Sequence, residues 1–462
     1  MAHEGLMVGV SGVRGRVGEG LTPEVVARFA AAFGAWAAGE SAGTRPKGAR
    51  AKVVLGRDSR VSGPMFHRVV VSALQSVGCD IIDIGMVPTP TVQLAVEHHH
   101  AAGGLAITAS HNPIEWNALK FIASSGLFLD AAQGTAMRQT LDGEIPRATW
   151  DMLGALTEDR DAVERHIARI LAIQFLDANA IRRRRFHVAL DCVRGAGAVI
   201  MPALLDRLGC KVTAINMETD GLFPRAPEPV AENLGDLEAL VKAHRADVGL
   251  AVDPDVDRLA LVSDAGTAIG EDFTLALAAR VVLQHRGGDL VTNLSTSRIM
   301  EDVANRAGRR VIRAPVGEVN VAVRMREEGA PIGGEGNGGV ILSEVHLGRD
   351  APVGAALVLH LLATEGKQLS EIVAGYPRYA IVKDKLDRPG VPLDGVYDAL
   401  KKAFPDATAD TQDGLRLAWS DRWVHVRPSG TEPIVRVIAE APDEAGARHM
   451  ILEARKLLDQ LA

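Results

Sequence analysis

Apolar residues recur along the chain in one order three times: a strand-like run, a helical stripe, a glycine and a second strand-like run. The first unit begins at 53–55 and reaches Ile81, and its helical stripe consists of Phe66, Val69, Val70, Ala73, Leu74 and Val77. Similar units begin at 188–190 and at 290–291. This order predicts βαβ units, which favour parallel strands joined by right-handed crossovers. We therefore expect three related α/β domains.

The pattern changes after residues 376–377. Short alternating strands such as 415–417 now stand between helical patterns at 396–404 and 444–461. This mixture predicts a separate α+β domain at the C-terminal end.

The predicted fold is therefore α/β, with three tandem related domains of mixed, largely parallel sheet and a C-terminal α+β domain. A chain of 462 residues is long enough for several such domains, each with its own core. We place the domains at 1–155, 156–264, 265–372 and 373–462.

Charge and cysteine content narrow the class of protein. Lys and Arg number 51 against 58 Asp and Glu, and the net charge of −7 argues against bulk binding to nucleic acid or to an anionic membrane. Three cysteines form no disulfide framework, and neither a leader peptide nor a spanning apolar run is evident. We expect a reduced cytoplasmic compartment, and a monomer or homodimer.

The segment Thr108-Ala-Ser-His-Asn-Pro113 predicts a presented hydroxyl. The apolar run 103–107 indicates a buried strand, and Pro113 blocks its simple continuation. Ser110 then lies on a tight loop, where a serine can carry a covalent intermediate if a neighbour or a metal activates it. A simple capping turn remains the alternative.

Three carboxylates at alternate positions, Asp253, Asp255 and Asp257, predict a site for a hard divalent cation. A calcium-binding EF-hand does not fit, because Arg258 replaces its glycine, Asp264 replaces its closing glutamate and the flanks are strand-like. The pattern favours a magnesium loop between two strands, and a solvated acidic turn is the alternative.

Two further loops carry candidate ligands. Gly333 to Gly339 packs five glycines around Glu335 and Asn337, which can bind hydroxyl groups. The segment Arg427-Pro-Ser-Gly-Thr-Glu-Pro433 with Arg436 offers guanidiniums, hydroxyls and a glycine amide, which together can hold a phosphate. Either loop, taken alone, is also compatible with an ordinary turn.

These four segments, in this order, resemble the α-D-phosphohexomutases, which interconvert 1- and 6-phosphosugars. The segments Gly9 to Gly15 and Gly56 to Arg60 resemble two further motifs of that family, so the likeness spans nearly the whole chain. The resemblance implies that Ser110 carries a phosphoryl group and binds one Mg²⁺ together with the three aspartates. It also implies a phosphosugar substrate and a hexose 1,6-bisphosphate as intermediate and activator.

The resemblance assigns the remaining roles as well. Lys120 would act as general acid or base, His111 would be a further catalytic residue, and Arg14 and Arg258 would stabilise the moving charge. A surface helix charge is the alternative for Lys120. Glu335 and Asn337 would contact the sugar. The distal phosphate would be held by Arg427, Ser429, Gly430, Thr431 and Arg436.

Two departures from the family bear on the sugar. Gly339 stands where many bacterial relatives have histidine, which predicts room near Glu335 and relaxed discrimination among hexoses. Ser429-Gly430-Thr431 resembles phosphoglucosamine mutases, so glucosamine phosphate is the first expectation and mannose or glucose phosphate the second. A magnesium-dependent serine phosphatase and a non-catalytic sugar-phosphate sensor are more distant alternatives.

Overall fold

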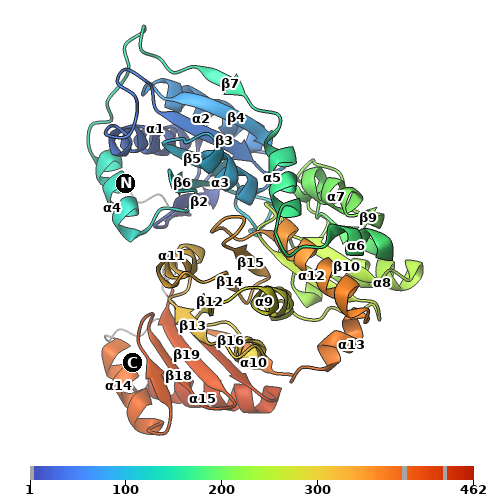
Figure 1. Ribbon diagram of the computed structural model, residues 1–462. Helices are drawn as coiled ribbons and strands as arrows, with labels where there is room; N and C mark the ends of the chain where they lie inside the picture. The colour runs from blue at the N-terminus through green and yellow to red at the C-terminus, as the bar shows by residue number, and fades with distance from the viewer. Residues whose placement is uncertain (1–4, 388–392, 430–433, 462) are drawn as a thin grey trace.

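The computed structural model describes residues 5–387, 393–429 and 434–461. Four β-sheets follow one another along the chain, and helices cover their faces (Figure 1). The first sheet lies at the top of Figure 1 and the last at the bottom, with the second and third between them.

The first sheet has seven strands in the order β1-β2-β6-β5-β3-β4-β7. Strand β3 pairs in parallel with β4 and β5, whereas β6 pairs antiparallel with β2 and β5. Its strands are β1 Leu6–Val8, β2 Gly12–Arg16, β3 Lys52–Arg57, β4 Asp80–Met86, β5 Gly103–Ile107, β6 Trp116–Ala123 and β7 Leu156–Glu158. Its helices are α1 Pro23–Glu40, α2 Gly63–Gln75, α3 Thr89–His98 and α4 Ala131–Asp142. Strand β7 pairs with β4, so this sheet extends past the predicted boundary at residue 155.

Local sequence explains where α1 begins and how it packs. The Thr22 hydroxyl accepts a hydrogen bond from the Val25 N–H at the N-terminus, and a proline occupies the first turn, where its missing N–H costs nothing. On the buried face, Phe33 stacks on Phe121 of β6 with ring centroids 5.2 Å apart. The helix is thereby fixed against the sheet that carries the Ser110 loop.

The second and third sheets have four strands each, in the orders β11-β10-β8-β9 and β13-β12-β14-β15. The second contains β8 His187–Asp191, β9 Lys211–Ile215, β10 Val248–Val252 and β11 Leu259–Ser263, with α5 Ala162–Leu171, α6 Ala178–Arg184, α7 Gly197–Arg207, the 3₁₀ helix η1 Ala231–Asn233 and α8 Gly235–His244. The third contains β12 Leu290–Asn293, β13 Val311–Ala314, β14 Ile332–Glu335 and β15 Gly339–Leu342, with α9 Asp272–His285, α10 Ile299–Arg306, α11 Glu318–Glu328, α12 Ala351–Glu365 and α13 Leu369–Ala374.

The repeated βαβ pattern of the sequence is confirmed. In each of the first three sheets, one parallel pair is joined through a helix: β3 with β4 through α2, β8 with β9 through α7, and β12 with β13 through α10. Each of these sheets also contains antiparallel pairs, which makes all three mixed.

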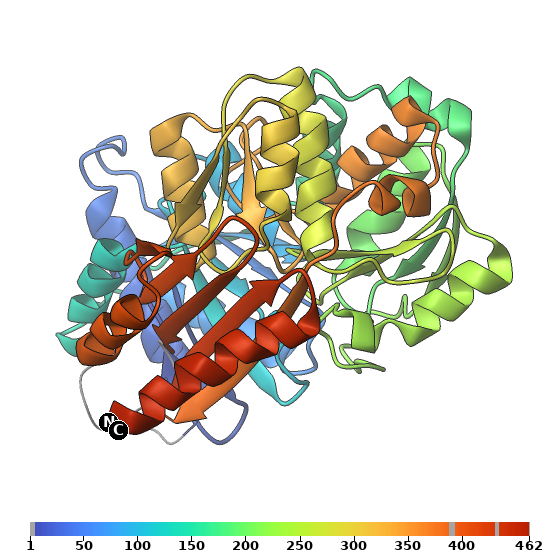
Figure 2. The same ribbon diagram turned by 90° about the horizontal axis from the view of Figure 1, so that it is seen from below.

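The last sheet is antiparallel throughout, in the order β16-β20-β19-β18-β17. Its strands are β16 Ala380–Asp387, β17 Thr408–Asp410, β18 Leu415–Ala418, β19 Trp423–Pro428 and β20 Ile434–Ala441, and its helices are α14 Leu393–Ala403 and α15 Glu444–Leu461. Figure 2 shows α15 lying along one face of this sheet. The predicted α+β character of the C-terminal part is confirmed.

The buried apolar residues do not divide as the sheets do. Two clusters belong to the first sheet and one to the last, and a small one lies on each of the second and third sheets, but the largest cluster runs through both the second and the third. Helix α12 lies in this shared cluster, where it packs against α9 and α6. The three cysteines are free thiols. None of the described helices combines the length and the apolar character that crossing a membrane requires.

Candidate active site

Ser110 lies in the tight loop between β5 and β6, as the sequence predicts. Its φ of +47° is in the left-handed region, which costs a non-glycine residue about 1–2 kcal/mol. The hydroxyl of Thr108 accepts a hydrogen bond from the Ser110 N–H at 2.9 Å and holds this conformation. The surrounding structure thus aims the serine hydroxyl out of the sheet edge.

A fully buried guanidinium, that of Arg60, holds the same loop from beneath. It donates to four backbone carbonyls: those of Pro113 and Trp116 at 2.8 Å, Asn112 at 2.7 Å and Ser110 at 2.6 Å. The Asp58 carboxylate balances its charge at 3.2 Å. The Gly56 to Arg60 motif therefore positions Ser110 from inside the first domain.

The three aspartates Asp253, Asp255 and Asp257 lie in the loop between β10 and β11, and each is at most 1% exposed. Ser110 Oγ donates a hydrogen bond to Asp253 Oδ2 at 2.7 Å. The serine loop of the first sheet and the aspartate loop of the second therefore meet at one point, although 143 residues separate Ser110 from Asp253.

The oxygens of these aspartates are divided between protein donors and open positions. Asp253 Oδ1 accepts the N–H groups of Asp257 and Arg258, and Asp255 Oδ2 accepts the hydroxyl of Thr89 at 2.6 Å. The other oxygens of Asp255 and Asp257, both Oδ1, accept no hydrogen bond from any residue that the structure describes. Burial and the neighbouring carboxylates raise the pKa of Asp253 well above its usual range. Buried, mutually repelling carboxylate oxygens are the donor set of a hard divalent cation, so this group could hold a metal ion.

Lys120 lies on β6, not on the surface of a helix. Its ammonium is 2.6 Å from Asp255 Oδ2 and 3.4 Å from Asp257 Oδ2. Burial disfavours its charge, but these two carboxylates outweigh burial and raise the pKa of Lys120. Arg14 is on the neighbouring strand β2, where Gly12 pairs with Lys120 and Arg14 with Ala118. Side chains alternate along strands, so Arg14 and Lys120 are on the same face of the sheet.

His111 and Arg258 flank the same loops. His111 Nδ1 lies 3.3 Å from Ser110 Oγ, and burial together with the charge of Arg258 lowers the pKa of this imidazole. Arg258 donates to Glu228 at 3.0 Å, and Glu228 also lies 3.9 Å from His111 Nε2. Glu228 was not singled out from the sequence, because it follows β9 in a long segment that carries no motif.

Glu335 ends β14 and is 5% exposed. Its Oε1 accepts hydrogen bonds from Asn293 at 2.8 Å and from the Gly317 N–H at 3.1 Å. Its Oε2 accepts from Arg349 at 2.8 Å and from Asn337 at 3.4 Å. The predicted sugar loop is thus a turn between β14 and β15 in which both oxygens of the Glu335 carboxylate accept hydrogen bonds from the protein.

The expected room at Gly339 does not exist. A Cβ placed there would lie 2.3 Å from Cδ of Arg349, so this arginine fills the space that a side chain would take. Arg349 was missed in the sequence because it lies ten positions further on, and only its place beside Asp350 at the start of an apolar helix signals it.

The predicted phosphate loop is in the last sheet. Arg427 on β19 pairs directly with Arg436 on β20, so both guanidiniums are on one face. Asp413 binds Arg427 at 2.8 Å and also accepts the Val316 N–H of the third domain at 3.1 Å. Ser429 ends this segment and is 9% exposed. Gly430 and Thr431 lie outside the described residues.

The structure therefore joins most of the predicted positions into one network. Ser110, Asp253, Asp255, Asp257 and Lys120 are in direct contact, and Arg349 connects Asp257 to Glu335. The last domain reaches this network next to Glu335, because Val316 binds Asp413 while the adjacent Gly317 binds Glu335.

A serine hydroxyl bound to a buried carboxylate triad, a glycine-rich loop and a basic loop on four α/β and α+β domains are the features of the predicted phosphohexomutase architecture. Comparisons with known proteins agree. The chain matches four domains described for phosphoglucomutase/phosphomannomutase: alpha/beta/alpha domain I over residues 5–146, domain II over 164–266, domain III over 270–379 and the C-terminal domain over 384–457.

Relatives match over nearly the whole of this chain. A probable phosphoglucosamine mutase of Methanopyrus kandleri is 40% identical, with 96% of each chain covered. A phosphoglucomutase/phosphomannomutase of Thermococcus kodakarensis is also 40% identical, with 99% of each chain covered. The crystal structure of a phosphoglucomutase/phosphomannomutase family protein from Burkholderia thailandensis matches with a TM-score of 0.83 at 27% identity, over 97% of this chain and 96% of that one.

The chain belongs to the phosphoglucomutase/phosphomannomutase family of the α-D-phosphohexomutase superfamily. It is accordingly a mutase, an intramolecular phosphotransferase of the isomerase class.

Proposed function

We propose that the enzyme interconverts glucosamine 6-phosphate and glucosamine 1-phosphate through a phosphorylated Ser110 and a 1,6-bisphosphate intermediate. The observation that carries this proposal is the 2.7 Å contact between Ser110 Oγ and Asp253, which puts the hydroxyl at the edge of a buried carboxylate triad. If this hydroxyl carries a phosphoryl group, a cation bound to the three aspartates can also neutralise the charge of that group.

Mg²⁺ is the ion that we assign to Asp253, Asp255, Asp257 and the phosphoryl group of Ser110. When bound, it neutralises charge on the phosphoryl oxygens, which is the main electrostatic requirement of phosphoryl transfer. The open Oδ1 atoms of Asp255 and Asp257 supply the ligand oxygens that such an ion needs.

In the first half-reaction, a free hydroxyl of the sugar attacks phosphorus on Ser110. The bond from the sugar oxygen to phosphorus forms and the bond from Ser110 Oγ to phosphorus breaks. The proton that the sugar hydroxyl loses is balanced by one that Ser110 Oγ takes up, so the serine hydroxyl is restored. Lys120, anchored on Asp255, and His111, beside Ser110, are the residues that we assign to proton transfer. Arg14 and Arg258 would stabilise the charge that moves.

The bisphosphate must then turn around, so that its other phosphate returns to Ser110. Arg427, Ser429, Gly430, Thr431 and Arg436 would hold whichever phosphate is not reacting. The facing positions of Arg427 and Arg436 on β19 and β20 support this role. Glu335 and Asn337 would contact the ring hydroxyls of the sugar.

Charge around the sugar loop supports an amino sugar. Glu318 and Glu335 share one cation, Arg349, which is also bound to Asp257. This excess of carboxylate suits a sugar whose amine is protonated. The second candidate is phosphomannomutase/phosphoglucomutase activity, since the relative from Thermococcus kodakarensis with that name is as similar as the one named for glucosamine.

The deciding experiment measures kcat/KM for the 1-phosphates of glucosamine, glucose and mannose on phosphorylated enzyme, together with release of inorganic phosphate. We expect glucosamine 1-phosphate to be preferred, with little phosphate released. A preference for glucose or mannose would select the second candidate. Release of phosphate without any 6-phosphosugar would indicate a phosphatase and refute mutase activity.

A further inference from the structure

We propose that Arg349 is a positioning residue that couples the metal loop to the sugar loop. This inference rests on the proposed phosphosugar and Mg²⁺ sites. The guanidinium of Arg349 contacts three carboxylates from three different segments. Its Nη2 lies 2.7 Å from Asp257 Oδ2, its Nη1 lies 2.8 Å from Glu335 Oε2, and its Nε lies 2.9 Å from Glu318 Oε2.

Only an arginine can make this set of contacts. The guanidinium has N–H groups that point in fixed directions around one plane, whereas the lysine ammonium is a single point on a flexible stem. Arg349 is 8% exposed, so the buried carboxylates of Glu318 and Glu335 would lose their cation if the fork were lost, whereas Asp257 would keep Lys120 at 3.4 Å. Asp257 and Glu335 therefore take their positions from the same rigid group.

Gly339 marks the path of this side chain. The stem of Arg349 passes so close to Gly339 that a Cβ there would collide with Cδ at 2.3 Å and Cγ at 3.0 Å. The glycine at the end of the sugar loop is thus required by the arginine that crosses it. The side chain of Arg349 therefore fixes the position of the sugar loop relative to the metal loop.

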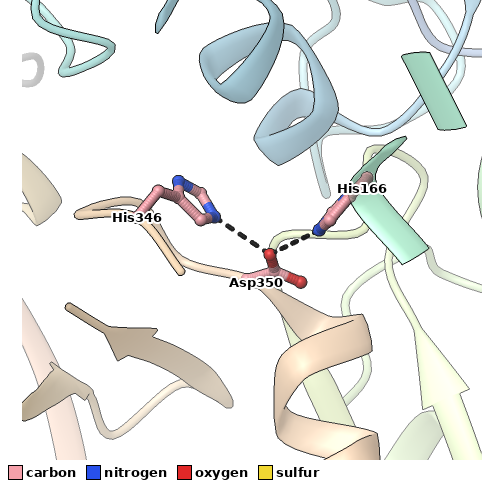
Figure 3. Close-up of side chains that lie close together, drawn as sticks. All are labelled: His166, His346 and Asp350. Carbon is pink, nitrogen blue, oxygen red and sulfur yellow. Dashed lines mark hydrogen bonds and ion pairs between the residues drawn. The ribbon is translucent and has the colours of Figure 1, made fainter. Parts of the chain in front are cut away.

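The fold also anchors the backbone next to Arg349, through a buried cluster of Asp350, His166 and His346 (Figure 3). His166 Nε2 and His346 Nε2 lie 2.7 Å and 2.9 Å from Asp350 Oδ2. The other carboxylate oxygen, Oδ1, accepts the Val353 N–H and caps α12. Burial alone would raise the pKa of Asp350, but His166 and the hydrogen bonds from both histidines lower it.

This cluster consists of hydrogen bonds and is not a second metal site. The Gly348 N–H donates to His346 Nδ1 at 3.2 Å, which leaves the proton of that ring on Nε2, facing Asp350. A metal would need the lone pair of that nitrogen. His166 is held in turn by Thr91 of α3 at 2.9 Å, so the anchor of Arg349 extends into the first domain.

Because Asp257 and Glu335 share the guanidinium of Arg349, we expect Mg²⁺ and the sugar phosphate to strengthen each other's binding. A cation on Asp257 weakens the hold of that carboxylate on Arg349, which frees the guanidinium to support Glu335 and the sugar. Coupling of this kind is reciprocal: the sugar phosphate must tighten the metal by the same factor as the metal tightens the sugar phosphate.

The test is calorimetric titration of Mg²⁺ into the full-length, dephosphorylated enzyme, with and without saturating glucosamine 6-phosphate. No phosphoryl group is available on this form, so binding is measured without turnover. We expect the wild-type Kd for Mg²⁺ to tighten by at least about fivefold when the sugar phosphate is present. In Arg349→Lys the ratio of the two Kd values should fall to about one, while both ligands still bind separately.

Arg280→Lys is the matched control. Arg280 is also an arginine of the third domain paired with a carboxylate, that of Glu365, but it touches neither loop. Its variant should keep the wild-type ratio. A general loss of stability would weaken Mg²⁺ with and without sugar equally and leave the ratio unchanged. Glu318→Gln supplies a second variant, which keeps Arg349 but loosens it, and its ratio should also fall.

A wild-type ratio in Arg349→Lys, or in Glu318→Gln if the first variant does not fold, would overturn the proposal. So would a ratio of one in the wild type with every sugar phosphate tested. The titrations are repeated with glucose and mannose 6-phosphates. One outcome is that Mg²⁺ binding is coupled to glucose or mannose 6-phosphate through Arg349 but is not coupled to glucosamine 6-phosphate. This outcome would support the role of Arg349 and reject the proposed substrate.

Discussion

Replacing Arg60 by lysine should displace the loop that carries Ser110 while leaving the serine hydroxyl itself unchanged. The substitution keeps the positive charge beside Asp58 but removes the fork that spans the serine loop. Each Nη group of Arg60 serves two carbonyls, one pair at Pro113 and Trp116 and the other at Ser110 and Asn112. A lysine ammonium has three donors at one point, and one of them is needed for Asp58.

At least two of the four carbonyls therefore lose their donor in a fully buried site. Hydrogen bonds to charged groups contribute about 1.5–3 kcal/mol each, so we expect a loss of about 3–6 kcal/mol from the free energy of unfolding. The serine loop should also relax. A displacement of about 1 Å from the reactive geometry can lower a rate by about 100-fold.

The assay follows phosphorylation of Ser110 by a hexose 1,6-bisphosphate using intact-protein mass, alongside thermal unfolding. Arg313→Lys is the control, because Arg313 is another buried arginine that donates to loop carbonyls, those of Asn293 and Thr296, while it pairs with Glu301. Both variants should lose stability, but only Arg60→Lys should phosphorylate slowly. Arg60→Lys that phosphorylates at the wild-type rate would refute the positioning argument.

Three further outcomes are expected. Ser110→Ala should abolish mutase turnover while leaving thermal unfolding intact, since a loop hydroxyl is removed without opening a core cavity; turnover is measured by 6-phosphosugar formation. Arg436→Ala should raise KM strongly and also lower kcat, because distal binding positions the reacting end, and X-ray scattering with and without bisphosphate should show the last domain closing. Burial, assisted by Glu440 and opposed by the Ser297 N–H, raises the pKa of Asp272 to about 7. A carboxyl whose pKa is raised on folding destabilises the fold as pH rises from about 4 towards 7, so Asp272→Asn should remove this fall from the pH profile of stability.

Each of these outcomes can fail in a recognisable way. Near wild-type turnover in folded Ser110→Ala would reject the phosphoserine. Identical scattering profiles at saturating bisphosphate would count against closure, as would an Arg436→Ala variant with unchanged kcat. If the stability of Asp272→Asn declines between pH 4 and 7 as steeply as that of the wild type, a group other than Asp272 causes the decline.

The sequence predicted the parts of the site that depend on short segments. The runs 103–107 and 248–252 are apolar and bounded by turn residues, so they indicated strands, and the loops that follow them carry Ser110 and the aspartates. The α+β character of the last part followed from its alternating strands. Order and spacing along the chain contain that information.

Contacts between distant segments could not be predicted in this way. Arg349 reaches Asp257 across 92 residues and Asp413 reaches Val316 across 97, and no local pattern links these partners. The expectation of open space at Gly339 was wrong for the same reason, since the side chain that fills it comes from a different turn. Lys120 was predicted as a proton-transfer residue only by resemblance, and its place between Asp255 and Asp257 depends on how two sheets pack.

We expect the second and third sheets to move together as one rigid body, because they share one apolar cluster. We therefore expect the four sheets to move as three bodies, because the first and the last each have a separate core. The aspartate loop and the sugar loop both lie on the shared cluster, so we expect their separation to stay fixed during the reaction. If the last domain closes as expected, only the distance to the far phosphate changes. The two fixed loops would then present the same geometry to both orientations of a bisphosphate.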